Sequence, residues 1–266
     1  MNLNKNYLQR ELYSRYGNIT RARGCFLYTQ KCVRLTDLCQ EGGRAILGWG
    51  GGTAFTMLKN TLNRGISGTF ETGFLYRTQK AVSELFNSER KVFFYNNYEK
   101  ALKASLLISK EGTNTYRPWS NTLEFWQNIP SIVFMPPLPW AQDLFLVCAK
   151  KELLADETLL ELLPEEDFVP APLLAAITRS IYDLISELPQ RQEKNFFIYD
   201  TVITKYWRRE GPYLFPKVPQ DKYKDFVLHC LDCKLVISPD YNKPSIVPFG
   251  ADAGNFTMLK NKPFEF

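Results

Sequence analysis

The sequence predicts α/β organisation in the first part of the chain and α+β organisation in the last part. Three observations carry this prediction. A buried apolar strand at 91–95 is followed at once by a helix at about 98–109, which makes a βα unit. The segment 171–188 repeats apolar residues at helical spacing, and Pro189 ends it. Short alternating segments lie near both ends, and the 266 residues suffice for one large domain or two modest ones.

The first elements in chain order are two short strands that predict a hairpin. Residues 25–29 and 33–35 alternate in polarity, and the glycine-rich segment 41–52 follows them as a loop. The segment 72–86 has apolar residues at helical spacing, so it predicts a helix. The βα unit comes next, and such a unit usually belongs to a parallel sheet.

The second part of the chain begins with an irregular stretch at 111–130, and several shorter elements follow. Apolar runs predict strands at 131–135 and 143–149, and an acidic helix at about 151–163 stops at Pro164. The acids Glu165, Glu166 and Asp167 predict a solvated loop. After the helix at 171–188 we expect a strand at 195–203, a helix at about 219–232, and strands at 234–238 and 244–248.

Composition and charge argue against a membrane-spanning, a secreted and a nucleic-acid-binding protein. The chain is 45% hydrophobic and 23% charged, and it has no run of about 18 apolar residues, so we expect no membrane span. The first residues lack the apolar region of a signal peptide, which predicts a cytoplasmic protein. The net charge is +5, and the basic residues are interspersed with Tyr, Leu and Ile. This pattern favours a solvated face over a weak anion-binding patch, and no nucleic-acid partner is expected.

The six cysteines predict no metal site. Cys230 and Cys233 form a single CxxC pair, and His229 is the one histidine, whereas a structural zinc site needs two such pairs or added histidines. The pair closes a predicted helix, where the helix dipole disfavours a thiolate. We expect buried, reduced thiols. No dinucleotide loop, Walker motif or Ser/His/Asp set is present, so the residues alone indicate no active site.

Several segments nevertheless follow an order that is typical of one family. They are RGCFLYT at 23–29, RLTDLC at 34–39, GG at 42–43, KVFFYN at 91–96, PAPLLAA at 170–176 and REGPYLFP at 209–216. In this order they resemble the pyridoxal-phosphate (PLP) aminotransferases of fold type I, class III. The matching parts of that family are the opening hairpin, the strand before the phosphate loop, the long linking helix and the C-terminal small domain.

The resemblance implies a reduced fold type I architecture, with a shortened large-domain sheet and a small α+β domain. The implied parts are an N-terminal segment at 1–60, a reduced large α/β domain at 61–170, a linking helix at 171–189 and a small domain at 190–266. Family dimers bury the segment that matches 41–80, so a homodimer is expected. The segment is glycine-rich here, and its apolar residues are Ile46, Leu47, Trp49, Phe55, Met57 and Leu58.

The position that matches the phosphate loop departs from the family pattern. The family has small residues there, which let backbone amides approach the phosphate at a helix N-terminus. This chain has Asn96, Asn97, Tyr98, Glu99 and Lys100. The bulk of Tyr98 and the charge of Glu99 disfavour a phosphate, and Lys100 partly offsets that charge. We therefore interpret these five residues as a vestigial phosphate loop.

Other functional residues of the family have no counterpart. The family places a ring-pairing Asp and the Schiff-base lysine between the phosphate loop and the linking helix, but 97–169 is short and has neither in a matching context. Lys150 and Lys151 match a later strand, and Pro244-Ser-Ile-Val-Pro-Phe lacks the substrate arginine. The sequence therefore predicts a non-catalytic binding or partner protein with no cofactor.

Two alternatives stay open. The chain could be a PLP-dependent aminotransferase with displaced residues, and Lys205, in a strand-like segment after Asp200, is then the Schiff-base candidate. The chain could also be a subunit that completes the site of a heteromeric partner.

Overall fold

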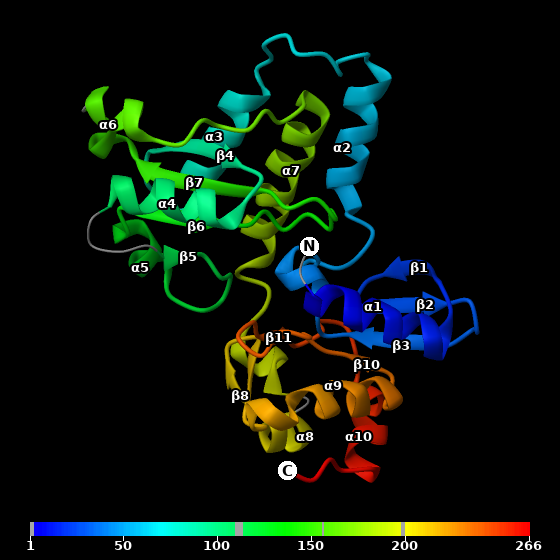
Figure 1. Cartoon of the computed structure of the whole chain (residues 1–266). Helices are drawn as coiled ribbons and strands as arrows, with labels where there is room; N and C mark the ends of the chain where they lie inside the picture. Colours follow the sequence, from blue (N-terminus) through cyan, green and yellow to red (C-terminus); the bar gives the residue numbers. More distant parts are fainter. Residues whose placement is uncertain (1–2, 110–113, 156, 198–199) are drawn as a thin grey trace. The chain divides into compact units, whose positions relative to one another are not determined.

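The computed structural model describes residues 3–109, 114–155, 157–197 and 200–266. Its contacts divide the chain into two compact units (Figure 1). One unit is continuous and spans Gly51–Gln190, and the other joins Met1–Gly50 to Arg191–Phe266.

The continuous unit has a four-stranded mixed sheet. Its strands are β4 (Arg90–Tyr95), β5 (Asn114–Thr115), β6 (Ser131–Phe134) and β7 (Phe145–Lys150), in the spatial order β4-β7-β6-β5. The prediction that 91–95, 131–135 and 143–149 share one sheet is confirmed. The expected parallel pairing is wrong for β4, which pairs antiparallel with β7. In this sheet β5 and β6 run parallel, whereas β6 and β7 run antiparallel. The strand that follows the crossover helix of β4 is β5, and it lies at the opposite edge of the sheet, so it does not pair with β4.

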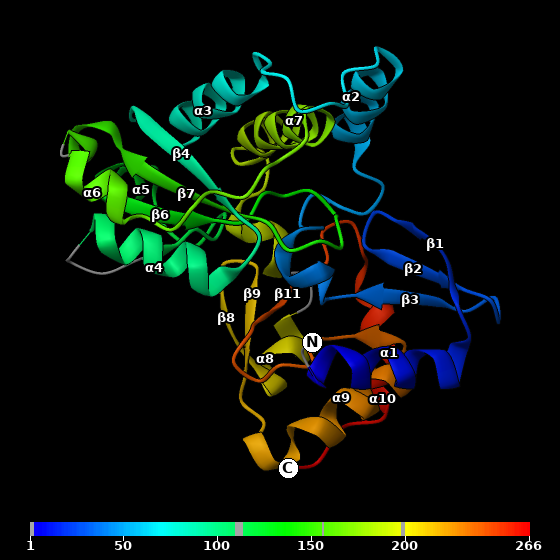
Figure 2. The same cartoon turned by 45° about the horizontal axis from the view of Figure 1, so that its top comes forward.

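Helices cover both faces of this sheet (Figure 2). They are α3 (Phe74–Leu85), α4 (Tyr98–Ile108), α5 (Leu123–Asn128), α6 (Glu157–Leu162) and α7 (Ala171–Glu187), and α2 (Gly52–Asn63) packs against α7. Phe93 and Tyr95 of β4 pack with Ala101 and Ala104 of α4. Since side chains alternate along a strand, Val92 and Phe94 face the opposite side, which α3 and α7 cover. The predicted helices at 72–86, 98–109 and 171–188 are confirmed.

The acidic helix expected at 151–163 is divided in two. A 3₁₀ turn spans Lys151–Leu154, α6 spans Glu157–Leu162, and residue 156 lies outside the described residues. Leu154 and Leu160 pack on the same core as α4. The apolar side chains of this segment therefore contact the sheet through two short pieces.

The discontinuous unit has two small sheets. One has the order β1-β2-β3-β10, from β1 (Ile19–Arg23), β2 (Phe26–Thr29), β3 (Arg34–Asp37) and β10 (Leu235–Val236), and the other joins β8 (Trp207–Glu210), β9 (Tyr213–Pro216) and β11 (Ser245–Ile246). The predicted hairpin is confirmed as β2 and β3, and β3 pairs in parallel with β10. The strands expected at 234–238 and 244–248 form, and each belongs to a different sheet.

Three of the four helices described in this unit were not predicted by the sequence pattern. They are α1 (Leu3–Tyr16), α8 (Asp200–Tyr206), α9 (Tyr223–Asp232) and α10 (Thr257–Asn261). The strand expected at 195–203 is wrong, because a 3₁₀ turn at Glu193–Asn195 and helix α8 occupy it, with residues 198–199 outside the described part. The helix at 219–232 is confirmed as α9 after a short 3₁₀ turn.

The glycine-rich segment at 41–52 is held by specific contacts. The Trp49 amide donates to the Gly24 carbonyl at 2.7 Å, which ties the segment to the hairpin. Gly51 has φ +59°, and a Cβ there would lie 2.0 Å from a ring carbon of Phe55. Glycine is therefore required at the start of α2. In the described part of the chain, no helix combines the length and apolarity needed to cross a membrane.

Candidate functional site at the N-terminal end of α4

The first turn of α4 is capped by a side chain of its own. The backbone leaves β4 at Tyr95, and Asn97 is extended, with φ −137° and ψ 132°. The Asn97 Oδ1 accepts hydrogen bonds from the amides of Glu99 at 2.7 Å and Lys100 at 3.2 Å. These are two of the free N–H groups that a helix presents at its N-terminus, so the cap satisfies them inside the chain.

The carboxylate of Asp167 lies at the same helix end. Its Oδ2 accepts a hydrogen bond from the Asn96 amide at 3.0 Å and from Lys100 Nζ at 3.1 Å. The amide hydrogen bond, together with Lys100, holds the pKa of Asp167 below its usual value. An anion with two donors therefore already occupies this position.

The chain around Asp167 lies along the outer edge of β4. The Asp167 amide donates to the Phe94 carbonyl at 2.9 Å, and the Phe94 amide donates to Glu166 Oε2 at 3.1 Å. The Tyr95 hydroxyl donates to the Pro164 carbonyl at 3.2 Å. The expected loop is present, and Glu165 and Glu166 are exposed to solvent, but its hydrogen bonds also satisfy the groups of an edge strand. Asp167 is half-buried, and desolvation beside β4 raises the pKa of Glu166.

A shallow cavity of about 520 Å³ opens at this helix end, and it is lined by Asn96, Asn97, Glu99, Lys100, Lys103 and Pro164. Four of the five residues of the expected vestigial loop therefore lie together. Tyr98 does not line it, because its hydroxyl is 3.1 Å from Thr115 Oγ1 and its ring contacts Phe145. Lys103 and Glu99 are exposed, whereas Lys100 is half-buried and paired with Asp167.

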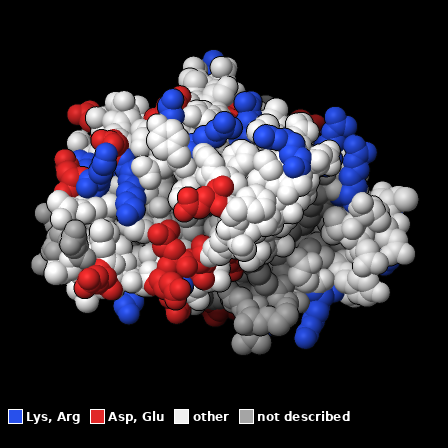
Figure 3. Space-filling view, turned by 90° about the horizontal axis from the view of Figure 1, so that it is seen from above, with Lys and Arg blue, Asp and Glu red and all other residues white. Residues whose placement is uncertain are grey.

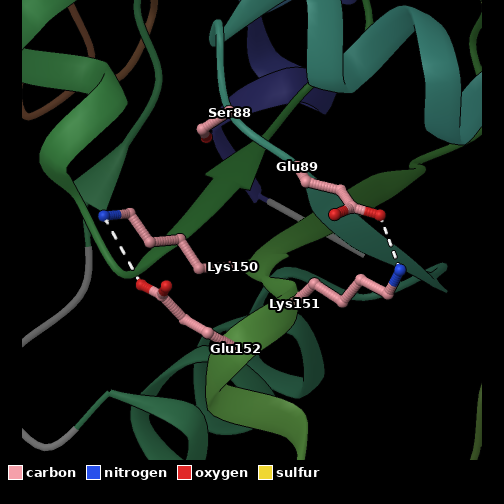
Figure 4. A pocket seen from close by; sticks show the side chains of 5 residues that line it. All are labelled: Ser88, Glu89, Lys150, Lys151 and Glu152. Atoms are coloured by element: carbon pink, nitrogen blue, oxygen red, sulfur yellow. Dashed lines mark hydrogen bonds and ion pairs between the residues drawn. The ribbon is translucent and has the colours of Figure 1, made fainter.

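A second cavity, of about 390 Å³, contains the two lysines that follow β7 (Figure 4). Lys151 Nζ lies 2.6 Å from Glu89 Oε1, and Lys150 Nζ lies 3.9 Å from Glu152 Oε1. Figure 4 shows each lysine directed toward its carboxylate. Both amines are therefore engaged in ion pairs at the protein surface.

The remaining lysine candidate lies in the discontinuous unit. Lys205 is on helix α8, its side chain is exposed, and its Nζ lies 5.3 Å from the centre of the Tyr206 ring. The residue is thus near the end of a helix and not in the strand that the sequence suggested. Among the residues that the structure describes, no group of three or more His, Cys, Asp or Glu is placed to hold a metal ion. Cys32 is exposed, contrary to the expectation of buried thiols, whereas Cys230 and Cys233 are buried.

Sequence reasoning missed two buried charged side chains that hold backbone segments in place, Arg90 in the continuous unit and Asp37 in the discontinuous one. Arg90 is fully buried and donates to the Cys148 carbonyl and to three carbonyls at the end of α5, those of Trp126, Gln127 and Ile129. Burial lowers the pKa of Arg90. Its position at the start of an apolar strand was the available signal.

Asp37 plays a similar part at the end of β3. Its carboxylate accepts hydrogen bonds from the amides of Cys39 and Gln40 and from Trp49 Nε1, the last at 2.7 Å. Burial raises the pKa of Asp37 to about 6, although these hydrogen bonds oppose the shift. Asp37 thus fastens the turn after the hairpin.

Charged side chains are dispersed on the face of the molecule seen in Figure 3. Lys and Arg lie scattered among uncharged residues, and Asp and Glu gather in a few small groups. Among the described residues on this face, Lys and Arg form no continuous stripe.

Comparison with known proteins relates this arrangement to other chains. No family model matches the sequence. A protein of Treponema pallidum (strain Nichols), described only as uncharacterized, is 26% identical over 293 positions, which span 90% of this chain and 92% of that protein. Another uncharacterized protein, from Borreliella burgdorferi, is 24% identical and spans 92% of this chain and 90% of its own length.

Solved structures give the clearest likeness. The ornithine aminotransferase of Plasmodium yoelii has a TM-score of 0.66 at 14% identity, over 98% of this chain and 97% of its own. The Toxoplasma gondii ornithine aminotransferase, crystallised with PLP partly occupying its active site, has a TM-score of 0.68 at 9% identity, over 92% and 87%. The N-acetylornithine aminotransferase of Stenotrophomonas maltophilia has a TM-score of 0.60 at 12% identity, over 94% and 96%. The chain therefore has the fold of the PLP-dependent ornithine and acetylornithine aminotransferases.

Proposed function

We propose that the chain is a non-catalytic protein of aminotransferase fold, retained as a binding or partner protein after the loss of PLP chemistry. One observation carries the proposal. This helix end resembles the family's phosphate loop. There the Asn97 side chain accepts hydrogen bonds from the amides of Glu99 and Lys100. Asp167 accepts hydrogen bonds from the Asn96 amide and from Lys100 Nζ. A cofactor phosphate needs such groups free, and it would meet the negative charges of Asp167 and Glu99. The residues present do not fit PLP.

The lysine inventory supports the same proposal. The family's Schiff-base lysine follows a strand that precedes the one matched by β7, and the strand that precedes β7 here is β6. After β6 the chain continues as Met135-Pro-Pro-Leu-Pro-Trp-Ala-Gln142, which contains no amine. Without an amine nucleophile at the cofactor aldehyde, covalent PLP catalysis has no starting point.

A shortened large domain is part of this proposal. Between α4 and α7 the described residues contain only three strands, β5, β6 and β7. The missing ring-pairing Asp and Schiff-base lysine belong to that interval in the family. A reduced central sheet would account for both losses at once.

A homodimer is the second part of the proposal. Four large apolar side chains are exposed on or near α2 and α3, namely Leu62, Phe70, Leu75 and Tyr76, with exposures from 46% to 71%. They belong to or adjoin the segment at 41–80 for which the family resemblance implies a dimer interface. Ile46, which was expected to contribute, is buried within the discontinuous unit. A heteromeric partner whose site this chain completes is the alternative occupant.

The competing function is a PLP enzyme that uses Lys205. The one observation in its favour is that Lys205 is an exposed amine, able to react with an aldehyde. Against it, the described contacts of Lys205 include no ion pair or hydrogen bond that would orient the amine.

Absorbance spectroscopy separates the two functions. The purified protein is incubated with a small excess of PLP, dialysed, and scanned between 300 and 500 nm beside the Lys205→Met variant. We expect both proteins to return to their starting spectra after dialysis. A retained cofactor band in the wild type that the variant lacks would establish the enzyme function instead.

A further inference from the structure

We infer that Asp167 is an internal anion that occupies, within the chain itself, the position at the N-terminal end of α4 where a phosphate would otherwise bind. The inference rests on the proposed function and deepens it, because it names the group that replaces the phosphate.

The geometry at this helix end is that of a bound anion. Asp167 Oδ2 accepts a main-chain hydrogen bond at 3.0 Å, from Asn96, and a charge-assisted one at 3.1 Å, from Lys100. An anion in this position is stabilised by the helix dipole. The lowered pKa of the Asp167 carboxyl has the same origin, since the donors favour its charged form.

The main chain fixes the carboxylate in place. The Asp167 amide donates to the Phe94 carbonyl at 2.9 Å, and Glu166 Oε2 accepts from the Phe94 amide at 3.1 Å. The backbone of residues 164–167 is thereby attached to the edge of β4, so the Asp167 side chain starts from a set position beside α4. A free anion must first lose translational freedom to bind there, whereas Asp167 has already done so through folding.

A phosphate cannot share the position with this carboxylate. Phosphate carries about −1.5 to −2 charges near pH 7, and Asp167 and Glu99 would both repel it. Removal of the Asp167 side chain leaves the Asn96 amide and Lys100 without their acceptor, next to a cavity that Lys103 also lines. The Asp167→Ala variant should therefore gain a site for inorganic phosphate that the wild type lacks.

The test is a titration of the full chain with inorganic phosphate, in which binding is monitored by the amide chemical shifts of Asn96 and Lys100. We expect the apparent dissociation constant of Asp167→Ala to be at least about tenfold below that of the wild type, a factor that corresponds to ~1.4 kcal/mol. The matched control is Glu165→Gln, which removes one negative charge from the same segment at an exposed side chain. That control should behave like the wild type.

Two further variants keep the test decisive. Asp167→Asn removes the charge while it keeps an acceptor oxygen, so it serves if the alanine variant does not fold, and it should show a smaller gain. Asp167→Ala combined with Lys100→Met should lose the gain. Equal phosphate binding by the wild type and Asp167→Ala, or an equal gain in Glu165→Gln, would overturn the inference. Either result would leave the proposed loss of PLP chemistry standing, since that loss is judged by cofactor retention in the wild type.

Discussion

Asp37 and Arg90 are buried charged side chains that form no ion pair with the residues the structure describes, and backbone groups stabilise both. Asp37 accepts from the Cys39 and Gln40 amides and from Trp49 Nε1, and Arg90 donates to carbonyls of α5 and β7. Burial of a charge is tolerated when hydrogen bonds replace the lost water. Each residue therefore fixes backbone segments that have few regular hydrogen bonds of their own.

The raised pKa of Asp37 predicts a pH-dependent stability. A folded-state pKa of about 6 lies above the value near 3.9 of an unfolded Asp, so the contribution of Asp37 to stability is complete below about pH 4 and is lost as the pH rises through 6. In Asp37→Asn the new NH₂ group would face the N–H of Trp49, and the lost hydrogen bond costs about 1–3 kcal/mol of stability. We expect the wild type to be more stable than Asp37→Asn at pH 4, and the difference in unfolding free energy between the two proteins to shrink by pH 7.

Denaturant unfolding at several pH values measures this difference. Asp252→Asn, at an exposed carboxylate, is the control and should show no such change in the difference. A wild-type advantage that grows from pH 4 to pH 7 would contradict the assignment.

Removal of the Arg90 guanidinium should be among the most damaging single changes. Arg90→Met leaves the carbonyls of Trp126, Gln127 and Ile129 without their donor. Unsatisfied buried polar groups cost about 1–3 kcal/mol each, so we expect a loss of more than ~3 kcal/mol in the free energy of unfolding. Lys91→Met, at the exposed neighbour, should cost less than about 0.5 kcal/mol. Comparable losses for the two variants would contradict this role.

At the scale of elements, the start of α2 depends on a glycine that no other residue can replace without strain. Gly51 and Gly65 both have positive φ, at +59° and +72°, but only a Cβ at Gly51 would strike the Phe55 ring. Gly65→Ala should therefore cost about 1–2 kcal/mol from the backbone alone. Gly51→Ala should cost more, and the excess measures the clash. Thermal unfolding of the two variants gives the comparison, and equal losses would show that the Phe55 ring moves aside freely.

Elements with strong periodicity were predictable, and those without it were not. The helix α7 has a continuous apolar stripe and a terminating proline, and the alternation of the hairpin is regular. Helix α1 was missed because polar residues dominate it, and between residues 7 and 16 the buried side chains are Leu8 and Leu12, four positions apart. The strand expected at 195–203 failed because alternating polarity over a short segment also fits one face of a helix such as α8.

The candidate site was predictable only in part, for a related reason. Asn97 to Lys100 follow a strand that has a clear sequence pattern, so their position was accessible. Asp167 is far from them in sequence, and three consecutive acids normally indicate a solvated loop. Only the pairing of residues 164–167 with the edge of β4 brings its carboxylate to the helix.

At the scale of the whole molecule, the strand order depends on contacts that no local pattern encodes. The pairs β3 with β10 and β4 with β7 join segments far apart in the chain. Composition alone did not predict an aminotransferase fold, whereas the resemblance of several segments to the aminotransferases did. The solved structures of that family match the fold of this chain. Their low sequence identities leave activity to be decided by the site.

The exposed apolar side chains predict a dimer. Sedimentation should give about twice the 30.8 kDa mass of one chain at micromolar concentration. Leu62→Glu combined with Leu75→Glu should give a monomer, because charges at a buried interface cannot be hydrated. Leu106→Glu changes an equally exposed leucine on α4 and should leave the dimer intact. A monomeric wild type would contradict the expected interface.

The central claim is that no lysine of this chain holds PLP. It is tested most directly by borohydride reduction of the protein in the presence of equimolar PLP, followed by peptide mass spectrometry. We expect less than one label per ten chains at every lysine, spread over exposed residues. Saturable labelling of one lysine at a ratio near one cofactor per chain, at Lys205 or elsewhere, would contradict the account and identify a PLP enzyme.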